Sequence, residues 1–221
     1  MGRPIRAVLE SRVRPGMHVA DVGANQGIFT LLLSRLVGPA GHVTAFEPDS
    51  IMAAALRSNL QANDAANVTL VEAGADSQPG VATIFRSRLN AGDNRLARGE
   101  LSESCSQAAV RVVRLDDVIP DLRLDFIKID TQGWEINVLE GMQGCLHQNP
   151  KLVILFEFWP GGLRHAGRQP ADLLAMLFEL GFEVSTIAGS RILPADVSAM
   201  VSRMGHRRYT DLIATRPVGS E

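Results

Sequence analysis

The segment Val19-Ala20-Asp21-Val22-Gly23-Ala24-Asn25-Gln26-Gly27 constrains the fold more than any other part of the chain. It leads a short apolar strand into a turn with two glycines, and an apolar segment of helical character, Ile28–Val37, follows. A strand, a glycine-rich turn and a helix in this order let backbone N–H groups approach a ligand, and the helix N-terminus favours negative charge. The segment therefore predicts a nucleoside pocket in an α/β fold.

The spacing of this turn departs from the dinucleotide pattern. It reads D-x-G-A-N-x-G rather than G-x-G-x-x-G, and an acid, Asp21, stands inside it. A carboxylate at this point would repel a pyrophosphate, whereas it could accept a hydrogen bond from an ammonium, such as the amino group of S-adenosylmethionine (SAM). The turn thus disfavours NAD and favours SAM, and a nicotinamide oxidoreductase is a remote alternative.

Composition limits the class of protein. The chain has 221 residues, 46% hydrophobic and 21% charged, with a net charge of −2, which suits one domain over 1–221 with a core of about 16–216. A net charge this close to zero does not indicate the basic surface with which proteins bind nucleic acid. Cys105 and Cys145 lack metal-ligand spacing, and no apolar segment is long enough for a leader or a membrane span. We expect a cytoplasmic protein with no nucleic-acid or membrane partner.

Strand-like and helix-like segments alternate, which predicts an α/β fold: a seven-stranded, mostly parallel sheet with helices on both faces and an antiparallel last strand. Strands are expected over His18–Val22, His42–Phe46, Val68–Glu72, Phe126–Ile129, Leu152–Phe156, Phe182–Thr186 and Tyr209–Thr215. Helices are expected over Gly27–Val37, Ser50–Ala62, Trp134–Cys145 and Ala171–Leu180.

Three further segments complete the prediction. Val81–Arg86 and Ala109–Arg114 could form a pair of edge strands. The polar segment Ser87–Gln107 between them is interpreted as a lid or a solvated loop. Ala188–Gly205 is expected to be irregular.

Acidic and small residues follow the second and third predicted strands. Glu47 comes at a strand end, where an acid about 20 residues after the glycine-rich turn can accept hydrogen bonds from ribose hydroxyls. Asp49 is either part of this site or the N-cap of the next helix. Gly74 and Ala75 would leave room for an adenine ring, and Asp76 could contact its amine or simply belong to a turn.

Asp130 ends the fourth predicted strand, at the edge where open α/β sheets bind ligands. It is the residue that we place beside the reacting centre, although it could instead cap the following helix. Lys128 is expected to bury its stem and bring its amine to the sheet edge. Glu135 lies in the first turn of the next helix, where its charge is favourable for structure alone.

Several motifs occur together in a family-specific order. They are Asp21–Gly27, Ala45–Pro48, Arg114–Asp117, Phe126–Glu135 and Ile154–Glu157. In this order, and over about residues 16–159, they resemble the FkbM-type SAM-dependent methyltransferases. The resemblance implies a Rossmann-like class I methyltransferase fold, SAM as the cofactor, and methylation of a hydroxyl on a small metabolite, sugar or natural product.

The resemblance also implies roles for individual residues. Asp21, Gly23, Asn25 and Gly27 would form the methionine and ribose side of the pocket. Glu47 would bind the ribose, Gly74 and Ala75 would line the adenine, and Asp130 would face the methionine amine or the methyl-transfer centre. One departure is Gln132, where the family often has an acid.

A hydroxyl is a poor nucleophile until a base takes its proton. Asp130 and Glu157, at the ends of adjacent predicted strands, are the catalytic candidates, with His165 and His206 as alternatives. The acceptor is expected to contact Trp159, which follows the fifth predicted strand at this edge, and Asn94 and Arg95 in the predicted lid.

Other possibilities are weighed against this reading. Two carboxylates could hold Mg²⁺, but no Asp-Asn pair follows the fifth strand, so no metal site is predicted. An amine or peptide acceptor is an alternative, although the aromatic N/D-P-P-Y signature is missing after the fourth strand. A SAM-binding protein without catalysis is a third reading. A homodimer is plausible because the chain has few elements to cover a substrate.

Overall fold

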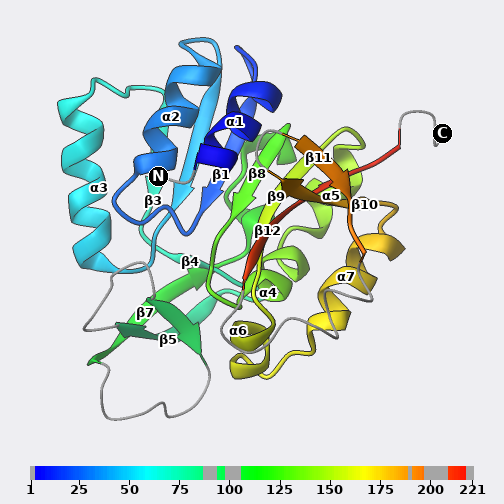
Figure 1. Ribbon diagram of the computed structural model, residues 1–221. Coiled ribbons are helices and arrows are strands. Elements are labelled where there is room, and N and C mark those ends of the chain that lie inside the picture. Colours follow the sequence, from blue (N-terminus) through cyan, green and yellow to red (C-terminus); the bar gives the residue numbers. More distant parts are fainter. Residues whose placement is uncertain (1–2, 87–93, 98–105, 189–190, 197–208, 218–221) are drawn as a thin grey trace.

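The computed structural model describes residues 3–86, 94–97, 106–188, 191–196 and 209–217 (Figure 1). Its main sheet has eight strands in the order β11-β10-β12-β9-β8-β1-β2-β3. The first five strands in sequence are parallel, and β10, β11 and β12 pair antiparallel with their neighbours. The strands are β1 (His18–Val22), β2 (His42–Phe46), β3 (Val68–Val71), β8 (Phe126–Ile129), β9 (Val153–Phe158), β10 (Glu183–Ala188), β11 (Arg191–Pro194) and β12 (Thr210–Thr215).

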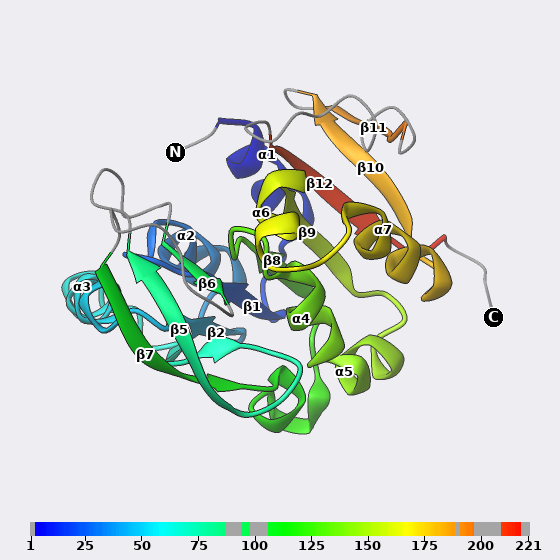
Figure 2. The same ribbon diagram turned by 90° about the horizontal axis from the view of Figure 1, so that it is seen from below.

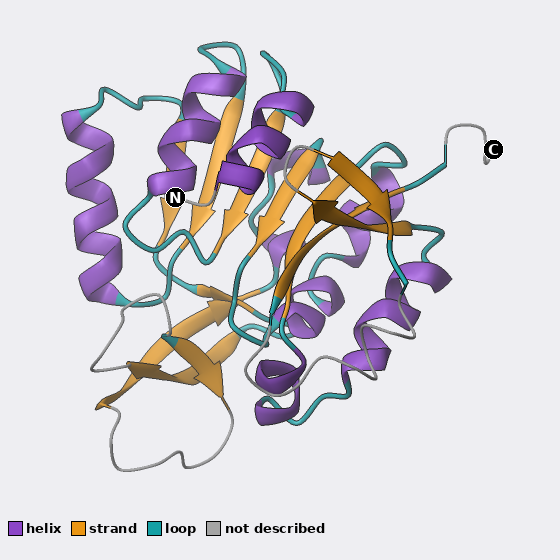
Figure 3. Cartoon of the chain, in the orientation of Figure 1, coloured by secondary structure: helices purple, strands orange, loops and turns teal. Residues whose placement is uncertain are grey.

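Helices cover both faces of this sheet (Figure 3). The helices α1 (Arg3–Arg12), α2 (Ile28–Val37) and α3 (Ser50–Ala62) lie on one face. The other face is covered by α4 (Glu135–Glu140), α5 (Gln143–Gln148), α6 (Pro160–His165) and α7 (Pro170–Glu179). Within the described ranges, no helix combines the length and the apolarity needed to cross a bilayer.

The two faces follow from the alternation of side chains along each strand. On β1, Val19 packs with α1 and α2, whereas Ala20 belongs to the cluster that includes α4 to α7. The same alternation holds on β8, where Phe126 and Ile127 face opposite clusters. Both faces are buried, as expected for a parallel sheet between helical layers.

A second sheet lies at the carboxyl ends of the main strands, beside β1 and β2 (Figures 1 and 2). It has the strand order β4-β7-β5-β6. Its apolar side chains, among them Ile84, Leu96 and Val112, pack against Trp134 at the start of α4. The strands are β4 (Gly74–Ala75), β5 (Gly80–Arg86), β6 (Arg95–Ala97) and β7 (Ser106–Val113).

The predicted α/β fold is confirmed, with corrections to the number of strands, to the two edge strands and to one helix. The main sheet has eight strands rather than seven, because Arg191–Pro194, in the segment expected to be irregular, pairs with β10. The two predicted edge strands, 81–86 and 109–114, form a sheet of their own instead of extending the main one. Within the predicted lid, residues 87–93 and 98–105 lie outside the described part of the chain, as do residues 197–208.

The predicted helix Trp134–Cys145 is broken in two. A side chain at Gly141 would overlap the carbonyl oxygen of Asp76, so this position needs glycine, a poor helix former. The next helix starts from a separate cap: Asp116 accepts hydrogen bonds from the backbone N–H groups of Gly144 at 2.8 Å and Cys145 at 2.9 Å. The two short helices α4 and α5 result. Two 3₁₀ turns, Leu115–Asp117 and Pro120–Leu122, precede β8.

Gly23, directly after β1, lies close to the backbone of Asp130, directly after β8. It has a φ of +79°, and an added Cβ would overlap the carbonyl oxygen of Asp130. Gly16 has a φ of +85°, but an added Cβ there would meet no atom within 4 Å. An alanine would strain the backbone at both positions, but only at Gly23 would its Cβ also overlap another atom.

We therefore expect Gly16→Ala to lower the free energy of unfolding by about 1 kcal/mol, from the left-handed backbone alone. Gly23→Ala should lower it by about 3 kcal/mol or more, because the overlap adds to that strain. Urea denaturation of both variants and the wild type measures the difference. Equal losses for the two variants would contradict the close approach at Gly23.

Candidate active site

A pocket lies between the carboxyl ends of β1, β2 and β8 and the second sheet. This is the edge at which open α/β sheets bind ligands. Six of the eight residues predicted to bind the cofactor line it. They are Gly23, Asn25, Glu47, Gly74, Ala75 and Asp130. The structure does not bring Asp21 or Gly27 to the pocket wall.

Glu47 is 5% exposed and is held by backbone groups on both sides. Its Oε2 accepts a hydrogen bond from the N–H of Asn25 and its Oε1 from the N–H of Asp49, both at 2.8 Å. Burial raises the pKa of Glu47 to about 7, although these two hydrogen bonds favour the charged form. Glu47 is thus fixed in orientation and titrates near neutral pH.

Asp49 is the N-cap of α3, one of the two roles considered from the sequence. Its Oδ1 accepts a hydrogen bond from the N–H of Ile51 at 2.9 Å. Arg86 also pairs with this fully buried carboxylate, at 2.8 and 3.1 Å, and Asn94 donates to it at 3.0 Å. Asp49 therefore fastens the second sheet to the first turn of α3, and Asn94, predicted to contact the acceptor, lines the pocket.

Gly74 and Ala75 form a narrow part of the pocket beside the apolar side chains of the second sheet. An added Cβ at Gly74 would lie 2.8 Å from Leu96 Cδ1 and 3.2 Å from Val112 Cγ1, so a larger residue would have to displace the pocket wall. Asp76 is turned to the protein interior, where its Oδ1 accepts a hydrogen bond from Asn137 at 3.0 Å. Asp76 therefore belongs to a turn, the second of the two roles considered from the sequence, and does not line the pocket.

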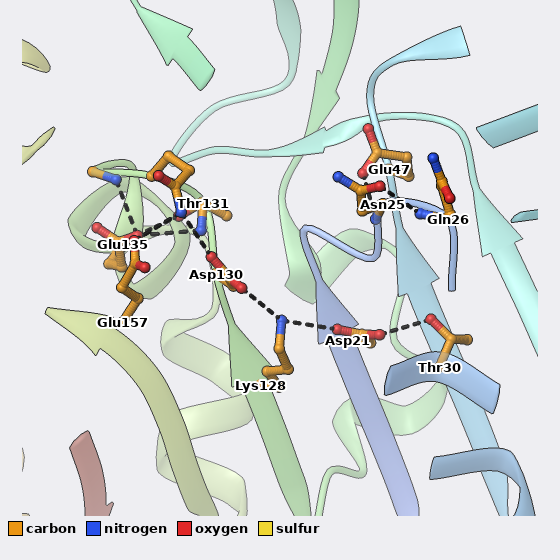
Figure 4. Close-up of polar contacts among 12 residues, drawn as sticks. Asp21, Asn25, Gln26, Thr30, Glu47, Lys128, Asp130, Thr131, Glu135 and Glu157 are labelled. Atoms are coloured by element: carbon orange, nitrogen blue, oxygen red, sulfur yellow. Dashed lines mark hydrogen bonds and ion pairs between the residues drawn. The ribbon is translucent and has the colours of Figure 1, made fainter. Parts of the chain in front are cut away.

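A row of charges crosses the ends of β1 and β8 (Figure 4). The ammonium of Lys128 lies 3.3 Å from Asp130 Oδ2 and 3.5 Å from Asp21 Oδ1, and Asp21 Oδ2 accepts a hydrogen bond from Thr30 at 2.7 Å. Burial by itself would lower the pKa of Lys128, but Asp130 and Asp21 outweigh it and raise the pKa to about 12. The amine reaches the sheet edge, as expected. The carboxylate of Asp21 pairs with Lys128 and accepts a hydrogen bond from Thr30.

Gln132 joins the two predicted catalytic carboxylates. Its Nε2 donates to Asp130 Oδ1 at 3.1 Å and to Glu157 Oε2 at 2.8 Å. Glu157 is 8% exposed, and its burial, followed by repulsion from Asp130, Glu135 and Asp211, holds its pKa well above the usual range. Asp130 and Glu157 therefore do meet at one edge, and the amide at position 132 separates their charges.

Glu135 has the structural role that its helix position suggested. Its Oε1 accepts hydrogen bonds from the hydroxyl of Thr131 at 2.9 Å, from the N–H of Thr131 at 3.2 Å and from the N–H of Gly133 at 3.1 Å. It is buried, and burial raises its pKa to about 7. This carboxylate fixes the turn that carries Gln132.

The remaining site predictions have mixed outcomes. Trp159 does not line the pocket; it is half-buried, with its ring centroid 6.2 Å from that of His165. Arg95 lies in β6, but its side chain is outside the described part of the structure, and His206 lies outside the described residues.

Sequence reasoning missed Asp211, the partner of Glu157 in the register between β12 and β9. Burial raises the pKa of Asp211 to about 6, and the charge of Asp130 contributes. The sequence signal for Asp211 is an acid near the start of an apolar strand. The local sequence does not show which strand lies next to it, and therefore does not show that Glu157 is its neighbour.

The sheet and its pocket define the fold class as that of class I methyltransferases, and solved structures agree. The O-methyltransferase TomG from Streptomyces achromogenes, in complex with SAM, matches 97% of this chain and 79% of its own with a TM-score of 0.56 and 13% identity. Precorrin-6y C5,15-methyltransferase from Geobacter metallireducens matches 97% and 87%, with a TM-score of 0.55 and 17% identity.

Sequence comparison gives the particular family. The model of the methyltransferase FkbM domain matches residues 21–184, so the chain belongs to the FkbM methyltransferase family. Methyltransferase sdnD from Sordaria araneosa is 27% identical over 198 residues, covering 76% of this chain and 74% of that protein. The 31-O-demethyl-FK506 methyltransferase FkbM from Streptomyces tacrolimicus is 31% identical over 160 residues, covering 59% and 61%.

The raised pKa of Glu47 has a measurable consequence for stability. Between about pH 4.5 and 7 the folded state holds a proton that the unfolded state releases, so rising pH should destabilise the wild type. Gln at this position does not titrate. We expect the free energy of unfolding of the wild type, relative to Glu47→Gln, to fall by on the order of 3 kcal/mol over this window, at about 1.4 kcal/mol per pKa unit. Urea denaturation of both proteins at several pH values tests this. A difference in the free energy of unfolding that does not change with pH would contradict it.

Proposed function

We propose that this protein transfers the methyl group of SAM to a hydroxyl of a small metabolite, sugar or natural product. The observation that carries the proposal is the position of Asp130, which lines the pocket together with Glu47 and Gly74 and is joined to Glu157 through Gln132. Two names support oxygen as the acceptor atom: one relative is a 31-O-demethyl-FK506 methyltransferase, and TomG is an O-methyltransferase.

The pocket fits a nucleoside cofactor. Each oxygen of Glu47 accepts one backbone hydrogen bond and keeps a second lone pair, which a ribose hydroxyl would use. Gly74 and Ala75, with Leu96 opposite, would hold the adenine in a narrow apolar slot. Gly23 and Asn25 would line the methionine side. Bound SAM supplies a methyl group made electrophilic by its sulfonium.

The chain itself would supply position and a base. Asp130 would take the proton of the acceptor hydroxyl while the new C–O bond forms and the C–S bond breaks, leaving S-adenosylhomocysteine. Lys128, 3.3 Å away, stabilises the charge of Asp130, and Gln132 fixes its direction. Glu157 would face the acceptor beside it. Positioning two reactants and removing this proton are the main contributions such a site can make.

Cofactor binding should depend on Glu47. We expect Glu47→Ala to weaken SAM binding at least tenfold in isothermal titration, because two hydrogen bonds to ribose would be lost. Glu72→Ala, which removes an exposed acid paired with Arg57 just after β3, should leave the affinity within twofold. Wild type that does not bind SAM would overturn the proposed function.

Methyl transfer should depend on Asp130. We expect Asp130→Asn to slow formation of S-adenosylhomocysteine by about 100-fold or more, the contribution of a general base, with SAM affinity within threefold. Asp121→Asn, at an exposed position before β8, is the control. The assay uses matched panels of hydroxyl and amine acceptors. Turnover with amines alone would contradict O-methylation, and SAM binding without any turnover would favour a non-catalytic protein.

A further inference from the structure

The carboxylate of Glu47 uses only half of its acceptor positions within the protein. Its Oε2 accepts the backbone N–H of Asn25 at 2.8 Å (Figure 4), and its Oε1 accepts the backbone N–H of Asp49 at the same distance. Among the described residues no other group donates to Glu47, so each oxygen keeps one lone pair. Glu47 lines the pocket, and these two lone pairs are the ones that a ribose would use.

A proton on Glu47 would take one of these two places. The backbone N–H groups are fixed and occupy the other lone pairs, so a protonated carboxyl has one acceptor position left for a ligand instead of two. A ribose presents two neighbouring hydroxyls, and both can donate only to the charged form. The proton and one ribose hydroxyl therefore compete for the same lone pair.

The surroundings of Glu47 favour its protonated form when the pocket holds no ligand. Burial raises the pKa of Glu47 to about 7, and the negative charges of Asp49 and Asp21 contribute. The cations beside these two acids are already paired, Arg86 from β5 with Asp49 and Lys128 from β8 with Asp21. In the part of the chain that the structure describes, no cation pairs with Glu47 itself.

A bound ribose would reverse this preference. Glu47 is already 5% exposed, so a ligand removes little further water from it and adds little to the effect of burial. Two hydroxyl donors stabilise the carboxylate, since a hydrogen bond to a charged group contributes about 1.5–3 kcal/mol, more than one to a neutral group. Asp130, the other acid in the pocket wall, has its own counter-charge, because the ammonium of Lys128 lies 3.3 Å away.

We propose that Glu47 releases a proton when SAM binds, so that cofactor affinity falls as the pH drops below neutral. This inference rests on the proposed function and adds a regulation of the same site. The proton passes from the carboxyl oxygen of Glu47 to the solvent, and no other bond changes. S-adenosylhomocysteine carries the same ribose and is coupled to the same proton.

Calorimetry can count this proton. At pH 6 about nine in ten Glu47 side chains are protonated, whereas the α-amino and carboxyl groups of SAM, with ordinary pKa values of about 8 and 3.5, keep one form. The wild type is titrated with SAM at pH 6 in two buffers that differ in their enthalpy of ionisation. We expect release of close to one proton per SAM bound, and a rise in affinity on the order of tenfold from pH 5.5 to 7.

Two variants assign the proton to its residue. Glu47→Gln keeps the side-chain shape and cannot ionise, so it should bind SAM more weakly, without proton release and with an affinity that does not change over this pH range. Glu72→Gln removes an exposed acid just after β3 and should release the proton as the wild type does. Proton release that persists in Glu47→Gln would overturn the inference.

A second measurement needs only the wild type. The ¹³C NMR signal of the Glu47 carboxyl is followed at pH 6 as S-adenosylhomocysteine is added, and we expect it to move from the position of a protonated carboxyl to that of a carboxylate. Adenosine, which has the ribose without the charged methionine part, should move the signal in the same direction. A signal that stays in place at saturating adenosine would contradict the role of the ribose.

The outcomes separate this inference from the proposed function. SAM binding without proton release at pH 6 would overturn the inference and leave methyl transfer from SAM as proposed. A wild type that does not bind SAM would overturn both. Turnover of hydroxyl acceptors does not depend on the result, because it is measured above pH 7, where Glu47 is charged with or without the cofactor.

Discussion

The ion triad of Asp21, Lys128 and Asp130 is the constraint on which this sheet edge depends. Asp21 and Lys128 are register partners on neighbouring parallel strands, and Asp130 follows on the same face. Without the ammonium, the buried carboxylate of Asp21 and the partly exposed carboxylate of Asp130 would repel each other, next to the close backbone approach at Gly23. The triad lets an apolar sheet end in charged groups while the strands remain paired to their last residue.

Local sequence was enough to find the parallel strands and the acids that end them. The bounds of β1, β2 and β8 agree with the expectation, because each is an apolar run that ends at a polar or glycine-containing turn. Glu47 and Asp130 were found for the same reason. The motif predicts Asp21 in the wall of the pocket because it gives only the sequence position of an acid, whereas the direction of this side chain depends on Lys128, more than 100 residues later.

The elements that sequence reasoning missed depend on long-range contacts. The break after α4 requires the carbonyl of Asp76 near Gly141 and the carboxylate of Asp116 at the start of α5, neither of which belongs to the helical segment. Asp211 acquires its place because β12 inserts antiparallel between β9 and β10. Alternation within one strand says which residues share a face, but it does not say which strand lies beside it.

The anchoring of the second sheet by Asp49 has a consequence for how a ligand enters. Arg86 and Asn94 both bind the buried carboxylate that also caps α3, so swinging the second sheet away would strip a helix cap and leave a buried charge unpaired. A rigid-body movement of the second sheet away from α3 would therefore be strongly unfavourable in free energy. The part of the pocket wall that Gly74, Ala75 and Leu96 form is best regarded as preorganised, and a ligand should enter and leave through the rim of the pocket, without any hinge at β5.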